Sequence, residues 1–360
     1  MPGPYPAAVP PPILEDPLPA STAAPKPRDP YLDNARGLLI ILVVVGHTLE
    51  CFGELESALG DALYTAIYSF HMAAFVMISG YLSRSYRNEP RQVKRLLTAM
   101  VVPYVIFQVV HEAGRSLLLG QDFSLPLVQP AWTLWFLLAL PLWRLTTPVL
   151  RNLRHPLLIA VAISVIAPLD HDLDGTLTLG RVAGMLPFFV LGLVSTPELL
   201  ERLRAVRQRW LGAVVMLGAL ACAFLLQDEV RNSWFYLRDA YPEDGNIPVN
   251  LVLRALVLVA GVVGALGLLL LTPRGISPLT VLGTRSLTIY LLHPVLLLPI
   301  RYAEQLPAWF GSWWGTLLIV LAAATLTLLL GSSIVSRATR WVTDPPIGHL
   351  LVRDEQAASR

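Results

Sequence analysis

The sequence predicts an all-α polytopic membrane protein, a bundle of about ten transmembrane helices. Apolar residues make up 54% of the 360 residues and charged residues only 14%. The mean hydropathy is +0.58. A soluble domain carries about 25% charged residues. We therefore expect most of the chain to lie in a lipid bilayer.

The two ends of the chain are expected to be polar tails. The first 30 residues hold eleven prolines and no long apolar run, so they fit neither a signal peptide nor a span. We predict a disordered cytoplasmic tail over 1–30, a membrane domain over 31–335 and a second cytoplasmic tail over 336–360. Without a cleavable signal, the first helix is expected to direct insertion.

The apolar stretches of the membrane domain predict the spans in order. A transmembrane helix needs roughly 20 predominantly apolar residues, and about 17 are tolerated. Two of the stretches are short and contain Pro141 and Pro168. The predicted spans are residues 37–54, 62–82, 96–113, 131–147, 156–170, 181–196, 209–227, 250–272, 280–300 and 314–335.

The basic residues alternate between the two ends of these spans. Lys and Arg collect in short cytoplasmic loops. With a cytoplasmic N-terminus, 21 of the 27 lysines and arginines fall in cytoplasmic segments. A missed or false span would disturb this alternation. We therefore expect a multi-pass protein of the cell membrane with both termini in the cytoplasm.

Four histidines fall inside predicted spans. A polar group in hydrocarbon is costly and is kept where it faces a cavity or a partner. His47 follows Arg36 by eleven residues, about 16 Å at 1.5 Å per residue, which is mid-membrane. His71, His111 and His293 lie on three other spans, in the central to outer half. A lone histidine often only hydrogen-bonds a neighbouring helix, and for these three that alternative stays open.

His47 favours a functional interpretation more strongly. It lies in "ARGLLIILVVVGHTLECFG", where Glu50 follows three residues later on the same helix face. A carboxylate at this spacing is able to orient an imidazole or bias its proton. We therefore predict that His47 and Glu50 act together.

Two loops offer candidate binding groups. The predicted cytoplasmic segment "RNEPRQVKRLLTAMVVPY" places Arg91, Lys94 and Arg95 near a helix N-terminus, where they suit phosphate. The same charges would also keep this loop on the cytoplasmic side of the membrane, and the two roles are compatible. In the predicted outer loop 227–250, Trp234 suits stacking on a sugar, and an interfacial aromatic belt is the alternative.

Other features point away from metals and nucleic acid. Cys51 and Cys222 show no metal-ligand spacing. The segment "DHDLDG" at 170–175 begins like a calcium loop, but Arg181 occupies the place of the required glutamate. A net charge of +2 gives no reason to expect a nucleic-acid partner. We expect no metal.

Small and aromatic residues in the spans predict packing. Gly261, Gly264 and Gly267 lie on the eighth span and are expected to allow close helix contact. Trp132 and Trp135 flank a span entrance, and we interpret them as interfacial anchors.

Several ordered motifs resemble the integral-membrane acyltransferase family 3, in its branch of fucose O-acetylase-like enzymes. They are "RDPYLDNARGLLIILVVVGHT", "FHMAAFVMISGYL", "LWFLLAL", "LPFFVLGL" and "SLTIYLLHP", and the resemblance covers nearly all of 31–335. Arg36 and His47 are separated by ten residues, as in that family's arginine-to-histidine signature. The family often carries a second arginine three residues after the one matched by Arg95, and Thr98 stands there instead. No esterase-like domain is appended, so transfer is expected to be completed within the membrane unit or with a partner.

The resemblance implies an O-acyltransferase. Such an enzyme moves a short acyl group, most simply acetyl, from cytoplasmic acetyl-CoA to a hydroxyl of a sugar, glycoconjugate or related metabolite. His47 would be the general base or a transient acyl carrier, with Glu50 orienting it. CoA phosphates would contact Arg36, Arg91, Lys94 and Arg95. The acceptor or a developing oxyanion would contact His71, His293 and Trp234.

Two other functions fit the same residues. Buried histidines also relay protons in secondary transporters, so a transporter or exporter of a saccharide or lipid-linked substrate is the alternative. A non-catalytic partner subunit would not need His47. The acceptor, the acyl length and the oligomeric state stay open.

Overall fold

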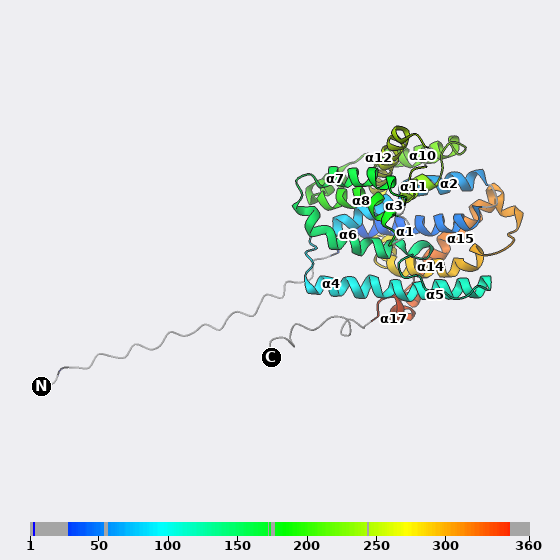
Figure 1. Cartoon of the computed structure of the whole chain (residues 1–360), viewed down its shortest axis with the longest axis horizontal. Coiled ribbons are helices and arrows are strands. Elements are labelled where there is room, and N and C mark those ends of the chain that lie inside the picture. Colours follow the sequence, from blue (N-terminus) through cyan, green and yellow to red (C-terminus); the bar gives the residue numbers. More distant parts are fainter. Residues whose placement is uncertain are drawn as a thin grey trace.

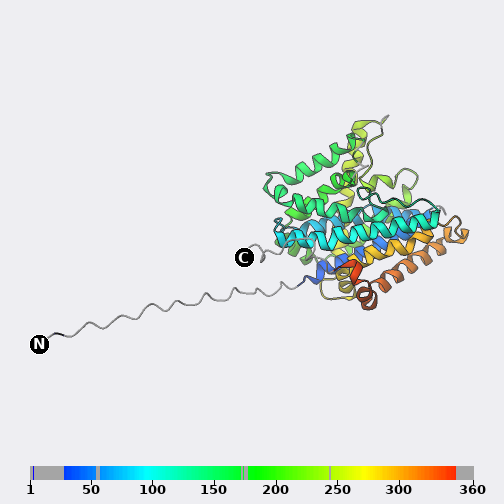
Figure 2. The ribbon, with the colours of Figure 1, turned by 60° about the horizontal axis from the view of Figure 1, so that its bottom comes forward.

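The structure is a computed structural model that describes residues 3, 28–53, 57–171, 173, 177–242 and 245–345. Helices and connecting segments make up these residues, and no strand occurs among them, which confirms the all-α class. Most of the predicted N-terminal tail and residues 346–360 lie outside the described residues. The long helices run side by side along one direction (Figure 1), and Figure 2 shows the same bundle turned by 60°.

The described part of the first half of the chain builds six α-helices, one π-helix and one 3₁₀ turn. They are α1 (Pro30–Cys51), α2 (Ala58–Tyr68), α3 (His71–Leu82), α4 (Pro90–Leu96), the π-helix η2 (Leu97–Val101), α5 (Val102–Leu119), the 3₁₀ turn η3 (Trp132–Leu134) and α6 (Trp135–Asn152).

The second half adds the remaining helices. They are α7 (Pro156–Ile166), η4 (Ala167–Leu169), α8 (Leu179–Val194), α9 (Pro197–Ala205), α10 (Trp210–Leu225), α11 (Ser233–Tyr236), α12 (Ile247–Leu271), α13 (Pro278–Thr284), α14 (Ser286–Arg301), η6 (Ala308–Gly311), α15 (Trp313–Leu330), α16 (Ser333–Ala338) and α17 (Arg340–Thr343). The last two lie at the start of the predicted C-terminal tail.

The predicted number of ten spans is not confirmed. Each predicted span falls on a helix, but within the described residues six helices are long and apolar enough to cross a membrane. The count rises to eight if the pair α8 and α9, bent by 89°, and the pair α13 and α14, bent by 76°, each form one span. The helices of the fifth and seventh predicted spans, Pro156–Leu169 and Trp210–Leu225, fall in a shorter class of 10–17 residues.

α1 is the central helix of the bundle. Of its apolar stretch, 78% is buried, against 33% for α15. The helix begins where Asp29 accepts a hydrogen bond from the backbone of Tyr31 and Pro30 fills the first turn. It packs against α2, α13, α14 and α15. Residues on α1 are therefore held by neighbours on several sides.

Glycines bring the helices close where the site is built. A Cβ at Gly37 of α1 would lie 2.2 Å from the carbonyl oxygen of Leu279 on α13. A Cβ at Gly80 of α3 would lie 2.0 Å from the carbonyl oxygen of Phe189 on α8. The prediction for the eighth span is also confirmed, since a Cβ at each of its three glycines would lie within 2.7 Å of a neighbouring side chain.

The outer helices present apolar side chains to their surroundings. Leu217 on α10, Val259 on α12 and Leu321 on α15 are 65%, 59% and 63% exposed. Exposed apolar surface on this scale is typical of helices that face lipid. The structure thus supports a multi-pass membrane protein.

The loops predicted to be cytoplasmic meet at one end of the bundle. Arg84 donates to the carbonyl of Ser195 at 3.1 Å, and Arg151 donates to the carbonyl of Arg84 at 2.8 Å. The start of α1 and the end of α15 both contact α13, through Gly283 and Leu282. We name this the arginine end, and the opposite end, which carries Glu50 and Arg301, the histidine end.

Candidate active site

Two of the predicted histidines form a direct pair. Nδ1 of His47 lies 3.0 Å from Nε2 of His293, and the two rings stack at a centroid distance of 5.2 Å. The residues are 246 positions apart in the sequence. The packing of α14 against α1 brings them together.

The backbone of α14 sets the proton positions in this pair. Nδ1 of His293 lies 2.9 Å from the carbonyl oxygen of Ile289. A carbonyl oxygen only accepts, so in the neutral ring Nδ1 of His293 carries the proton and Nε2 is an acceptor. Nδ1 of His47 then donates to His293. In the neutral pair, Nε2 of His47 is therefore left unprotonated.

Aromatic rings surround the imidazole of His47. The ring centroids of Trp132 and Tyr68 lie 5.4 and 6.2 Å from that of His47. A Cβ at Gly46 would lie 3.0 Å from the ring of Tyr68, so this glycine lets the tyrosine approach α1. Trp132 has a backbone φ of 36°, a left-handed conformation that is rare for a bulky residue. Such strain persists where the surroundings hold it, which is common at functional sites.

Glu50 bonds to this aromatic shell. Its carboxylate accepts from the indole N–H of Trp132 at 3.1 and 3.2 Å and from the hydroxyl of Tyr68 at 3.2 Å. It also forms a 2.9 Å ion pair with Arg301, whose guanidinium stacks over the Trp132 ring. The side chain that shares a hydrogen bond with His47 is His293. The influence of Glu50 on His47 thus runs through Trp132 and Tyr68, which contact both.

These residues face a cavity of about 350 Å³. That volume is within the usual range for small-molecule sites, about 300–1,000 Å³. We name it the main cavity, and its lining residues are His47, Glu50, Tyr68, His71, Met72, Pro130, Trp132, Thr133, Trp135, Arg181, Met185, Phe235, Tyr236, Arg238, Tyr290 and Arg301.

His71 joins the main cavity as a second imidazole. Its Nδ1 lies 2.8 Å from the carbonyl oxygen of Ile67, so in the neutral ring Nε2 is again the acceptor. The ring of Tyr68 lies 4.7 Å from that of His71. The structure therefore brings three predicted histidines, His47, His71 and His293, to one site.

The predicted outer loop contributes two neighbours of Trp234 to the main cavity. Phe235 and Tyr236 line the main cavity, while Trp234 packs against the hydrophobic core. All three lie on α11. A four-residue helix turns neighbouring side chains in different directions, which the sequence alone does not resolve.

The four predicted phosphate-binding residues lie at the arginine end. Arg36 donates to the hydroxyl of Ser286 at 2.8 Å and pairs with Asp33 at 3.4 Å. Arg91 and Arg95 are exposed, and Lys94 is partly buried on α4. Thr98, which stands in place of a second arginine, donates its hydroxyl to the carbonyl of Lys94 at 3.0 Å.

Arg144 on α6 joins this group, and the sequence does not single it out. Its guanidinium donates to the hydroxyl of Ser83 at 3.2 Å. It lies within electrostatic range of Arg36 and Arg95. Side chains from α1, α4 and α6 thus form one cationic cluster.

Comparison with known proteins agrees with the motifs. A family model described as an acyltransferase domain matches residues 29–335. The chain belongs to this acyltransferase family. The match confirms the resemblance to acyltransferase family 3 and covers the helices that carry both histidine partners and the arginine cluster. No solved structure matches the chain.

Two curated relatives are similar in sequence to parts of this chain. Nodulation protein NolL of Sinorhizobium fredii is 28% identical over 223 residues, which is 58% of this chain and 60% of that protein. Nodulation protein NolL of Mesorhizobium japonicum is 31% identical over 125 residues, which is 34% of this chain and 29% of that protein. The chain therefore spans less than two thirds of the length of either relative.

Three residues around the candidate site are not indicated by the sequence. Trp132 was interpreted as an interfacial anchor, and Arg301 and Tyr68 were not singled out. Trp132 and Arg301 are typical span-end residues, so composition favours an anchoring role for both. Their contacts with Glu50 arise from helices far apart in the chain.

Proposed function

We propose that the protein is an O-acyltransferase that moves an acetyl group from acetyl-CoA to a hydroxyl of a sugar or glycoconjugate. Membership of the acyltransferase family supports the reaction type. The cationic cluster at one end and the aromatic, hydrogen-bonding cavity at the other support the two substrates.

The hydrogen-bond chain from the carbonyl of Ile289 through His293 to His47 is the observation that carries this proposal, because it makes Nε2 the acceptor in the neutral ring of His47. An alcohol becomes a good nucleophile when a positioned base takes its proton. In the proposed step, Nε2 of His47 accepts the hydroxyl proton as the acceptor oxygen attacks the thioester carbonyl. The carbon–sulfur bond then breaks, and the leaving CoA thiolate takes the proton back from the imidazolium.

His293 keeps His47 in place through both halves of the reaction. Nδ1 of His47 donates to His293 whether the ring is neutral or protonated, so the hydrogen bond survives proton uptake. A fixed ring needs no reorganisation at the moment of transfer. His293 is thus a positioning residue in this proposal.

The main cavity suits a sugar acceptor. Trp132, Tyr236 and Phe235 offer aromatic faces to the apolar side of a ring. Glu50, His71 and Arg238 offer acceptors and donors to hydroxyl groups. The same cavity places these groups beside His47.

The cationic cluster suits the phosphates of acetyl-CoA. Guanidinium groups bind phosphate through charge-assisted, often bidentate hydrogen bonds. Arg36 and His47 are about 16 Å apart along α1. In acetyl-CoA, the long pantetheine arm likewise separates the phosphates from the thioester. The proposal therefore includes a donor that enters from the arginine end, at the cytoplasmic face of the cell membrane.

Replacement of His47 tests the proposal. Purified His47→Ala is expected to lose about 10²- to 10⁴-fold of its transfer of radiolabelled acetyl from acetyl-CoA to an envelope glycan fraction. The control is His155→Ala, because His155 is exposed at the start of α7, away from the cavity. Full activity of a folded His47→Ala would refute the assignment. Saccharide flux driven by a proton gradient without acetyl consumption would favour a transporter.

A further inference from the structure

One buried arginine lies outside the main cavity and outside the cationic cluster. Arg254, near the start of α12, is only 8% exposed and does not line the main cavity. Its guanidinium donates through Nε to the carbonyl of Ser164 at 3.2 Å and through Nη2 to the carbonyl of Leu237 at 3.0 Å. A charged side chain buried in a membrane bundle is costly and is kept where it has a task. Because both acceptors are backbone carbonyls, Arg254 ties two chain segments together.

The first of these carbonyls is available because of a proline four residues later. Pro168 has no N–H, so the helical hydrogen bond from position 168 to the carbonyl of Ser164 cannot form. Arg254 supplies a donor in its place. The next carbonyl, that of Val165, accepts from the hydroxyl of Tyr241 at 2.9 Å. The end of α7 is therefore an anchor for the segment that follows α11.

The second carbonyl, that of Leu237, lies at the end of α11. Leu237 is buried and has a backbone φ of 52°, a left-handed conformation that is uncommon for a leucine. A Cβ at Gly184 of α8 would lie 2.0 Å from the carbonyl oxygen of Leu237 and 2.7 Å from the guanidinium of Arg254. The glycine thus leaves room for both groups. Such a backbone conformation persists where the surroundings hold it, and here α8 and Arg254 do so.

This turn carries residues of the main cavity. Tyr236 and Arg238 stand directly before and after Leu237, and both line the main cavity. The guanidinium of Arg238 lies 5.3 Å from the centre of the Tyr236 ring and pairs with Asp239 at 2.9 Å. A shift of the Leu237 carbonyl would therefore move two groups that face the cavity.

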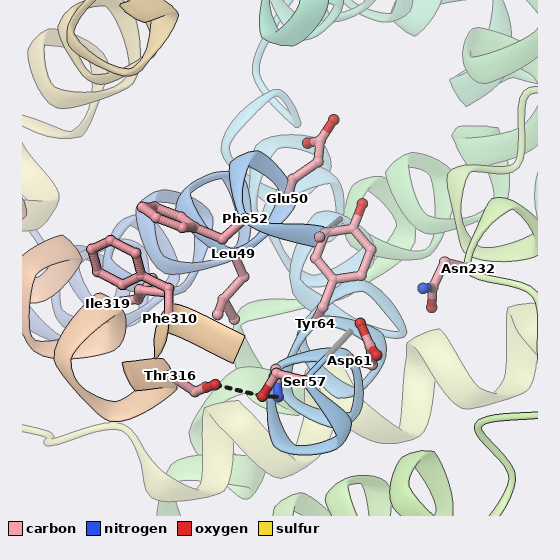
Figure 3. Close-up of a pocket in the computed structure, with 12 residues that line it drawn as sticks. Leu49, Glu50, Phe52, Ser57, Asp61, Tyr64, Asn232, Phe310, Thr316 and Ile319 are labelled. Atoms are coloured by element: carbon pink, nitrogen blue, oxygen red, sulfur yellow. Dashed lines mark hydrogen bonds between the residues drawn. The ribbon is translucent and has the colours of Figure 1, made fainter. Parts of the chain in front are cut away.

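The same segment is fastened on its other side to α2. The hydroxyl of Thr65 donates to the side-chain oxygen of Asn232, and the hydroxyl of Tyr236 lies 2.6 Å from that of Tyr64. Figure 3 shows the side chain of Asn232 facing that of Tyr64, at a second cavity of about 230 Å³ that both residues line. Tyr236 is thus held on the α2 side through its hydroxyl and on the α12 side through Arg254.

We propose that Arg254 is a positioning residue for the acceptor: by holding the carbonyl of Leu237, it keeps Tyr236 and Arg238 turned to the main cavity. This inference rests on the proposed function. Arg254 touches no substrate in this scheme, so its effect on the acceptor runs through the two cavity residues. The donor is proposed to enter from the arginine end, so its binding does not depend on the turn after α11.

Two variants of Arg254 test this role. Arg254→Met keeps an unbranched side chain and removes every donor, which leaves two buried carbonyls without this partner. It is expected to raise the half-saturating concentration of the envelope glycan fraction about tenfold and to leave the KM for acetyl-CoA unchanged. Arg254→Lys keeps the charge as a single point donor, so it should hold one carbonyl and limit the rise to about threefold.

A matched control is available at another arginine that donates to a backbone carbonyl. Arg285 donates to the carbonyl of Gly331 and lines neither of the two cavities. Arg285→Lys makes the same chemical change as Arg254→Lys and should leave the half-saturating glycan concentration unchanged. The melting temperatures of these two variants separate a loss of stability from a loss of positioning. Arg254→Lys decides the question if Arg254→Met does not fold.

Hydrogen exchange measures the turn without any substrate. Residues 233–241 include backbone N–H groups that are hydrogen-bonded within the fold. In protein purified in detergent, peptides that cover this segment should exchange faster in Arg254→Met than in wild type. In Arg285→Lys they should exchange at the wild-type rate.

Three results would overturn the inference. Unchanged exchange in Arg254→Met would show that the turn does not depend on the arginine. Faster exchange with an unchanged half-saturating glycan concentration, or an equal rise for glycan and acetyl-CoA, would leave Arg254 with a structural role only. In these cases the acyltransferase proposal stands, because wild type still transfers acetyl. If wild type labels no glycan, the proposed function fails first, and this inference falls with it.

Discussion

The two ends of the helix bundle carry charge in different ways. At the histidine end, Glu50 and Arg301 are paired, only 27% and 30% exposed, and bonded to aromatic side chains. At the arginine end, Arg91 and Arg95 are exposed, and Arg144 lies within electrostatic range of Arg36 and Arg95. The charged groups at the histidine end are held by ion pairs and aromatic rings, whereas those at the arginine end include exposed cations.

This difference indicates two kinds of ligand. An aromatic cavity whose charged groups are held by partners offers hydrogen bonds and ring faces, so it suits a polyhydroxy compound. A cluster in which different helices bring several guanidinium groups together suits a polyanion. A reaction that joins ligands from both ends needs a catalytic group between them, and His47 lies about 16 Å along α1 from Arg36. Variants at each end are therefore expected to change different kinetic constants.

The largest expected effect after loss of His47 itself is at His293. His293→Ala removes the acceptor for Nδ1 of His47 and frees the ring to turn or to take the wrong tautomer. We expect kcat to fall about 100-fold, by analogy with orienting residues in other imidazole-dependent sites, with little change in the KM for acetyl-CoA. Steady-state transfer of labelled acetyl at varied acetyl-CoA concentration measures both constants.

A conservative variant separates positioning from folding. His293→Gln places an amide oxygen near the position of Nε2, so it should retain more activity than His293→Ala. Equal loss in both variants, together with lower thermal stability, would show that His293 has only a packing role.

Arg36 is expected to act on the donor alone. Arg36→Ala should raise the KM for acetyl-CoA about tenfold with a small change in kcat, because a charge-assisted phosphate bond is lost. Arg144→Ala should act in the same direction. The control is Arg202→Ala, since Arg202 lies exposed on α9, outside the cluster. A comparison with acetyl-dephospho-CoA identifies which arginine contacts the 3′-phosphate, because its effect should vanish with that substrate.

A change in the acceptor KM on replacement of Arg36, or an equal effect of Arg202, would contradict the separation of the two ends. The basic residues at the arginine end would then serve only to keep their loops on the cytoplasmic side, which is the alternative role that the sequence also allows.

Variants of the Glu50–Arg301 pair measure how far this ion pair matters for use of the acceptor. Glu50→Gln leaves Arg301 without its partner and should lower kcat/KM for the acceptor about fivefold, since a partly exposed pair contributes about 1 kcal/mol at most. Arg301→Gln should have a similar effect. The double variant should be no worse than either single one, which a double-mutant cycle detects. Additive losses would show that the two residues act independently.

The spacing of His47 and Arg36 along one helix can be predicted from the sequence, but the pairing of His47 cannot. Hydropathy and the rise per residue give this spacing, because both depend on position along one helix. The contact of His47 with His293 depends instead on how α1 and α14 rotate about their axes. Ser286–Arg301 is apolar over most of its length, so no periodicity indicates which side faces α1.

The number of spans is difficult to predict from the sequence for a related reason. Hydropathy detects apolar length but not bends such as the 76° break between α13 and α14. In the fold, Arg285 at that break donates to the carbonyl of Gly331. A contact with a residue 46 positions away is outside the reach of a local pattern. Close helix contacts at glycines such as Gly264 are easier to predict, because small residues mark close approach.

The smallest expected effect at the arginine end is that of replacing Arg91. It is exposed in the first turn of α4, so its attraction for a phosphate is screened by water and salt. Arg91→Ala should raise the KM for acetyl-CoA about twofold at low ionic strength, and the difference should disappear at about 0.5 M salt, where the Debye length falls below about 5 Å. The effect of Arg36→Ala should persist in the same salt series, because Arg36 is partly buried. A twofold effect of Arg91 that survives high salt would instead place its guanidinium in direct contact with the donor.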